Sequence, residues 1–292
     1  MSRRRNTPAA HKILRKEIRR ADRALQRPGA GDEDIHDARR HIKKARAALR
    51  LLRCTLSKSQ FEGEDALLRE AAQPLGTLRD DKILLQSLKD IVVHYRGAAP
   101  LSGTRTLRRR LTRDLTVDRA KFLDGDGGLG RARGALHEAR RCARRLTKRP
   151  AANQLFHGLR RTYGQGRAAL RQSKESLDAE HLHALRKRTK YLAHQLRAFP
   201  PSHGAAISRT ATAFHKLSDD LGEHHDLTVL GDRIAHCARV FPDGQSQIRL
   251  LALIEQHRVG LERRALLLAD RLYRPKRRQF AGRIRHAARG PH

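Results

Sequence analysis

Two sequence motifs occur twice in this 292-residue chain, and each second copy lies half a chain length after the first. The motif His-x-x-Arg-(Arg/Lys)-x-x-Lys begins at His36 and again at His183, an offset of 147 residues. The motif Leu-Gly-x-x-x-Asp begins at Leu75 and at Leu221, an offset of 146 residues. Two copies of so long a unit exclude a solenoid and predict a duplication. We therefore expect two similar helical bundles related by a pseudo-twofold axis.

The composition is typical of α-helices. Ala, Leu, Arg, Glu, Lys and Gln dominate, apolar residues recur at helical spacing, and alternating runs of Val, Ile and Thr are missing. We predict an all-α fold with helices at residues 9–27, 34–56, 60–73, 75–95, 102–123, 131–148, 152–175, 179–199, 203–220 merging into 221–240, and 245–273.

The domain organisation follows from the duplication. We predict repeat one at about residues 9–148 and repeat two at about residues 150–273. A basic arm, residues 1–8, precedes them. A basic tail, residues 274–292, follows and contains so few apolar residues that we expect it to be frayed.

The His-x-x-Arg motif predicts a helix with one apolar side and one basic side. On a wheel of 100° per residue, the basic face of the first copy contains His36, Arg39, Arg40, Lys43 and Arg50. The basic face of the second copy contains His183, Arg186, Lys187, Lys190, His194 and Arg197. We call these two faces the basic ridges. Exposed helix faces usually mix both signs, because like charges one turn apart repel. A row of cations without acids therefore indicates a chain of phosphates as ligand, because guanidinium and ammonium groups bind phosphate oxygens.

The charge of the whole chain also indicates an anionic polymer as partner. The chain has 64 Lys and Arg against 30 Asp and Glu, a formal net charge of +34 at pH 7. Self-repulsion at this charge weakens the compact state unless a polyanion neutralises it. The longest aliphatic runs, Leu250–Ile254 and Ala265–Ala269, are too short to span a bilayer, and the N-terminus does not resemble a secretory signal. Three cysteines without CxxC spacing argue against a disulfide framework and are compatible with a reducing compartment.

These motifs resemble the CHAD family, the conserved histidine α-helical domain. The family's basic helix is matched by His36, Arg39, Lys43, Lys44 and Arg46, and its second copy by His183, Leu185, Arg186, Lys187, Lys190 and Leu192. The segments Pro74–Leu85 and Leu217–Leu230 resemble the family's Leu-Gly-x-x-x-Asp helix, so that the resemblance covers about residues 9–273. The chain departs from the family pattern at Ala193, His194 and Arg197.

The resemblance implies a fold of two pseudo-symmetric four-helix bundles. It also implies binding of inorganic polyphosphate in a central basic channel. By position, the ligand contacts would be His36, Arg39, Lys43, Lys44 and Arg46, together with His183, Arg186, Lys187 and Lys190.

Two matching acids, Asp80 and Asp226, follow the second motif in each half. We expect each of them to pair with a cation or histidine of a basic helix and to orient it. With His36-Asp37 and His224-His225 they also allow a weaker alternative, a metal-dependent phosphohydrolase. No P-loop, nucleophile elbow or dinucleotide fingerprint is present in the sequence. We therefore predict a non-catalytic protein without catalytic residues, bound metal or other cofactor.

Non-specific nucleic-acid binding is the other alternative, because a charge of +34 gives some affinity for DNA and RNA. Against it, the chain has no Trp, only 4 Tyr and 7 Phe for base stacking, and no RRM, KH or zinc-finger signature. We expect inorganic polyphosphate as the partner, no membrane span, and a cytoplasmic location, at polyphosphate granules as the resemblance implies. Protein partners are not predicted.

The ridge histidines, finally, are expected to be neutral without ligand. The surrounding Arg and Lys disfavour the charged imidazole, whereas a bound phosphate chain favours it. We therefore predict proton uptake on binding; the alternative is that His36 and His183 are neutral packing groups.

Overall fold

The structure is a computed structural model that describes residues 9–27, 31–99, 101–124, 127–146, 150–176, 178–199, 205–237, 241 and 243–288. The regular structure within these residues is entirely helical, which confirms the all-α prediction. The first half forms α1 (Ala10–Gln26), α2 (Asp32–Leu51), η1 (Leu52–Thr55), α3 (Lys58–Ala72), α4 (Pro74–His94), α5 (Leu101–Leu123) and α6 (Gly128–Arg145). The second half forms α7 (Ala152–Glu175), α8 (Ala179–Arg197), α9 (Ala205–Ala235), α10 (Gly244–Tyr273) and α11 (Arg277–Ala287). The predicted basic arm, residues 1–8, lies outside the described residues.

The two ridge helices, α2 and α8, begin at acidic caps. At the start of α2, the carboxylate of Asp34 accepts a hydrogen bond from the backbone N–H of Gly31 at 3.0 Å. At the start of α8, the carboxylate of Asp178 accepts one from the backbone N–H of His181 at 2.8 Å. Each carboxylate satisfies an N–H group at the positive end of its helix. The caps therefore fix the ends from which the basic ridges start.

The larger hydrophobic core joins helices of both halves of the chain. Leu49 of α2, Leu192 of α8 and Tyr163 of α7 are all buried in it. The buried side chain of Gln195 on α8 donates hydrogen bonds to the carbonyl oxygen of Ala47 on α2, at 3.2 Å, and to a hydroxyl on α7, at 3.0 Å. The two ridge helices are therefore packed directly against each other.

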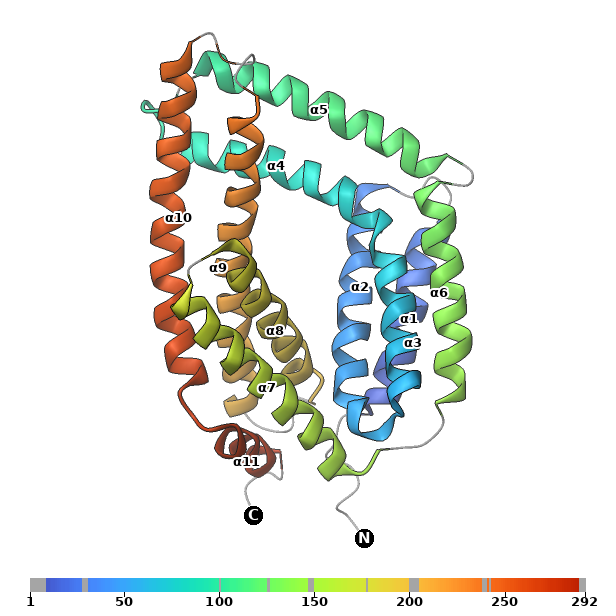
Figure 1. Ribbon diagram of the computed structural model, residues 1–292. Coiled ribbons are helices and arrows are strands. Elements are labelled where there is room, and N and C mark those ends of the chain that lie inside the picture. The colour runs from blue at the N-terminus through green and yellow to red at the C-terminus, as the bar shows by residue number, and fades with distance from the viewer. Residues whose placement is uncertain are drawn as a thin grey trace.

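A smaller core lies at the other end of the molecule. Leu88 of α4 and Leu107 of α5 pack there with Leu230 of α9 and Leu250 of α10. Figure 1 shows α4 and α5 crossing from the helices of the first half to the upper ends of α9 and α10. Both cores thus contain helices from both halves, so they do not divide the molecule into one bundle per repeat. The duplicated two-bundle arrangement stays a prediction.

Residues 277–287 form helix α11, where the sequence analysis expects a frayed tail. Phe280 and Ile284 lie one turn apart on this helix and are buried. The ring of Phe280 stacks on that of Tyr163, with 3.9 Å between the centroids, and the Tyr163 hydroxyl donates to the carbonyl oxygen of Pro275 at 2.9 Å. The expectation was wrong for this segment because α11 buries Phe280, Ala281 and Ile284 and packs on α7.

We find no helix in the described part of the chain that is long and apolar enough to cross a membrane.

Candidate functional site

All residues assigned to the basic ridges lie on α2 and α8, and the packing of these two helices brings them together. Their exposure differs along each helix. His36 and Arg40 of α2 and Lys187 of α8 are exposed, whereas Lys43 and Arg186 are half-buried. The cations therefore do not form one uniform face but fall into groups with different partners.

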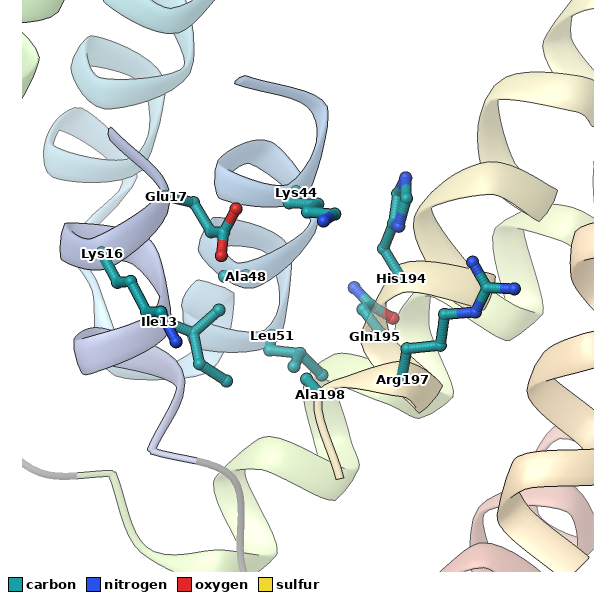
Figure 2. A pocket seen from close by; sticks show the side chains of 10 residues that line it. All are labelled: Ile13, Lys16, Glu17, Lys44, Ala48, Leu51, His194, Gln195, Arg197 and Ala198. Carbon is teal, nitrogen blue, oxygen red and sulfur yellow. The ribbon is translucent and has the colours of Figure 1, made fainter. Parts of the chain in front are cut away.

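The first group lines a pocket of about 290 Å³ between α1, α2 and α8 (Figure 2). Lys44, His194 and Arg197 surround this pocket, with Glu17 of α1 on the opposite wall. The Glu17 carboxylate is only 2.6 Å from Nδ1 of His41, so that its charge already has a partner. Burial lowers the pKa of the Lys44 ammonium, the Glu17 charge opposes that shift, and the charges of Arg40, Arg20 and Arg197 add to it. Three cations, Lys16, Lys44 and Arg197, thus line this pocket together with one carboxylate, that of Glu17.

Two histidines of α8, His183 and His194, have pKa values that favour the neutral imidazole. Burial, with the charge of Lys190 next in importance, lowers the pKa of His194 to about 3. Burial, with the charge of Lys187 next, lowers the pKa of His183 to about 4. Both pKa values are lowered because desolvation and nearby positive charges disfavour the charged imidazole. These directions agree with the prediction that ridge histidines are neutral without ligand, although burial contributes more than the cationic neighbours on which that prediction was based.

The second group consists of two arginines that lie against glycines. A Cβ atom at Gly76 of α4 would lie 3.4 Å from Nη1 of Arg39, and one at Gly222 of α9 would lie 3.3 Å from Nη2 of Arg186. These are the glycines of the repeated Leu-Gly-x-x-x-Asp motif and the arginines of the repeated His-x-x-Arg motif. In both halves a guanidinium thus lies against the glycine of the neighbouring helix, and at Gly222 an added side chain would press on it.

The third group, Arg46 and Arg50, is bound to an acid. Both arginines form paired hydrogen bonds with the Asp65 carboxylate of α3, Arg46 at 2.9 and 3.3 Å and Arg50 at 3.0 and 3.3 Å. Burial alone would raise the pKa of Asp65, but the hydrogen bonds and charges of the two arginines lower it below its ordinary value. The Arg50 guanidinium also lies over the Tyr191 ring, 4.0 Å from its centroid. These contacts lock the two arginines against α3 and α8.

Sequence reasoning missed the role of Asp65. Its signal was present, because Asp65 lies three residues before Leu68 on the buried side of α3, where an apolar residue is expected. An acid on the apolar stripe of a helix in so basic a chain indicates a buried ion pair.

The ridges also meet exposed acids that the wheel did not reveal. Lys190 lies 3.3 Å from Asp219 of α9, and Arg40 lies 3.0 Å from Asp37 one turn earlier on α2. Both carboxylates are well exposed, at 56% and 39%. Exposed ion pairs contribute little, about 0 to 1 kcal/mol, so a phosphate chain can replace them.

Cations of α2 and α8 also act on one another. Burial lowers the pKa of Lys187, and Arg46 of the opposite helix is the next cause. Burial likewise lowers the pKa of Arg188, followed by the charge of Arg50. Arg188 was not among the predicted site residues because the wheel places it away from the ridge. The interface between the two helices therefore concentrates positive charge.

The predicted orienting acids differ between the halves. The carboxylate of Asp226 is 3.4 Å from Nδ1 of His225, and the His225 ring stacks on His183 with 4.5 Å between centroids. Asp226 therefore contacts the basic helix at least through the His225 imidazole, and its charge acts on His183. Asp80 is exposed on α4. The orienting role of both acids stays a prediction.

A search of the described residues for three or more His, Cys, Asp and Glu side chains able to hold one metal ion finds no such group.

Comparison with known proteins gives one family and two solved structures of interest. A family model described as the CHAD domain matches residues 9–235. PptA from Streptomyces chartreusis is 16% identical, with a TM-score of 0.66, and the match covers 92% of this chain and 100% of that one. The CHAD domain from the plant Ricinus communis is 19% identical, with a TM-score of 0.55, covering 98% of this chain and 94% of that one. At these identities the two structures show a shared fold. No curated protein matches the sequence.

Proposed function

This chain belongs to the CHAD domain family, and on that premise we propose that it binds inorganic polyphosphate along α2 and α8 without catalysing a reaction. The observation that carries the proposal is the mutual effect of cations across the α2–α8 interface. Each cation lowers the pKa of its neighbour because a like charge disfavours the neighbour's charged form, and a polyanion bound there would relieve that repulsion. A linear phosphate chain supplies one charge per unit and needs no base-recognising groups.

The surroundings of the ridges favour polyphosphate over nucleic acid at this site. Tyr191 lies among the ridge cations, but it is buried and the Arg50 guanidinium covers its ring. It therefore does not offer the free aromatic face on which proteins stack unpaired bases. The ridge side chains suit phosphate groups and offer nothing that would recognise bases.

A pair of variants with equal charge tests the proposal. The ridge variant carries Gln at Arg39, Lys43, Arg186 and Lys190. The α10 control carries Gln at Arg249, Arg263, Arg264 and Arg271, which are exposed on α10 and take part in no ion pair among the described residues. We expect the ridge variant to bind long-chain polyphosphate at least about 100-fold more weakly at 0.15 M salt, and the control only a few-fold more weakly.

Circular dichroism of both variants establishes that they are folded. If the folded ridge variant and the α10 control lose the same affinity, net charge rather than the ridges binds the ligand, and the proposal is wrong.

The non-catalytic part of the proposal has its own test. Polyphosphate is incubated with the protein and Mg²⁺ or Mn²⁺, and released phosphate is measured. We expect no release above a blank. Release that Asp226→Asn abolishes while binding persists would favour the metal-dependent phosphohydrolase instead. We further propose a cytoplasmic location at polyphosphate granules, to be checked by fluorescence microscopy of the tagged chain.

A further inference from the structure

Helix α5 has an exposed face that is rich in arginine and also carries Thr106, Thr112 and Thr116. Its exposed arginines are Arg105, Arg108, Arg109, Arg110 and Arg113. At 100° per residue they cover an arc of about 200°. Leu107 and Leu111 lie on the opposite side of the helix and are fully buried in the smaller core. The buried leucines fix the rotation of α5, so that the arginine face points to solvent.

The charge of this face is not compensated. Within the described part of the chain, no ion pair includes any of these five arginines. The acids that α5 carries are engaged elsewhere: Asp114 is 2.5 Å from Arg233 of α9, and Asp118 is hydrogen-bonded to Asp81 of α4. Exposed helix faces ordinarily mix both signs, because like charges one turn apart repel. No ion pair within the described residues offsets the repulsion among these arginines. This indicates that an external polyanion neutralises them.

The arginine face is separate from the basic ridges. Helix α5 packs on α4 and α6, and Figure 1 shows it along the outer edge of the molecule, with α4 between it and α2. The arginine face and the ridges thus belong to different helices, and the inference does not rest on the polyphosphate proposal.

The shape of this face selects the ligand. The arginines lie on both flanks of a convex helix, and a thin linear chain can contact only one of these flanks. The major groove of B-form DNA is about 12 Å wide, close to the diameter of an α-helix with its side chains, and has phosphates along both walls. The major groove of A-form RNA is deep and too narrow for this approach. We infer that the arginine face of α5 binds the major groove of duplex DNA, without sequence preference and through the phosphates.

The test uses an α5 variant with Gln at Arg105, Arg108, Arg109 and Arg113, next to the α10 control with its equal charge change. The probes are a mixed-sequence DNA duplex of about 20 base pairs, the same sequence as duplex RNA, and long-chain polyphosphate. We expect the α5 variant to bind the DNA at least about 10-fold more weakly. Its slope of log affinity against log salt should be less steep by about 3 to 4, since four phosphate contacts are lost. Its affinity for polyphosphate should change less than about twofold.

Three outcomes would overturn the inference. Equal losses of DNA affinity in the α5 variant and the α10 control would assign the effect to net charge. A loss of polyphosphate binding with unchanged DNA binding would assign the face to polyphosphate. Duplex RNA bound by the wild type as tightly as DNA would contradict the argument from the groove. Because the ridge variant keeps α5 intact, failure of the polyphosphate proposal leaves the DNA measurement unaffected.

Discussion

The buried neutral imidazole of His194 should make the protein sensitive to acid. Burial and the charge of Lys190 lower its pKa to about 3 in the folded protein, from an ordinary value of 6.5. Below pH 6.5 the unfolded chain binds a proton at this position and the folded protein does not, so stability falls as the pH falls. At pH 5 this difference amounts to about 2 kcal/mol, since one pKa unit corresponds to 1.36 kcal/mol.

Replacing His194 with Gln removes the titrating group. Between pH 7.5 and pH 5 the free energy of unfolding should decrease in both proteins. We expect the decrease to be about 2 kcal/mol smaller in this variant than in the wild type. Urea unfolding followed by far-ultraviolet circular dichroism at the two pH values gives both differences. His157, which is exposed on α7, provides the matched control His157→Gln, which should lose as much stability as the wild type. Equal losses in His194→Gln and wild type would show that His194 is not held neutral, and the electrostatic description of the α2–α8 interface would be wrong.

The other predictions concern three positions around the ridges. Gly222→Ala should weaken polyphosphate binding about 3-fold or more in equilibrium titrations, because its Cβ would lie 3.3 Å from Arg186. The control Gly231→Ala should leave the affinity unchanged, because its Cβ would meet its nearest atom at 3.9 Å. Equal effects of the two variants would refute the argument that Gly222 makes room for Arg186. Asp65→Asn should lower the free energy of unfolding by about 3 kcal/mol, because it leaves two half-buried arginines without their carboxylate, and a loss below about 1 kcal/mol would contradict this. Bound phosphates should raise the pKa of His183 from about 4 by about two units, so that the affinity for polyphosphate is about 10-fold higher at pH 5 than at pH 8. If His183→Asn shows the same increase in affinity at pH 5, other groups take up the proton.

The basic helices could be predicted from the sequence because their information is local. A single apolar stripe in each motif determined that residues 36–50 and 183–197 form helices, and which of their side chains face away from the core. The cationic neighbours of His183 and His194 followed from the wheel, but their burial, which contributes most to the lowered pKa values, did not.

Interactions between distant segments could not be predicted in this way. The pairing of Arg46 and Arg50 with Asp65 depends on how α3 crosses α2, and the wheel of α2 treats all its cations alike. Likewise, the smaller core mixes α4 and α5 with α9 and α10, whereas the duplication suggested that each half folds on itself. Helix propensity and periodicity describe one segment at a time, and tertiary packing decides which segments meet.

The central claim is that the ridge cations of α2 and α8 neutralise a phosphate chain, and its most direct test is the salt dependence of polyphosphate binding. Affinity is measured by titration between about 0.05 and 0.3 M salt for the wild type and for the ridge variant. Each neutralised phosphate of a single chain contributes about 0.7 to the slope of log affinity against log salt. We predict a steep linear fall for the wild type and a slope less steep by about 3 for the ridge variant, which lacks four cations. A flat dependence for the wild type, or the same slope for both proteins, would contradict the claim.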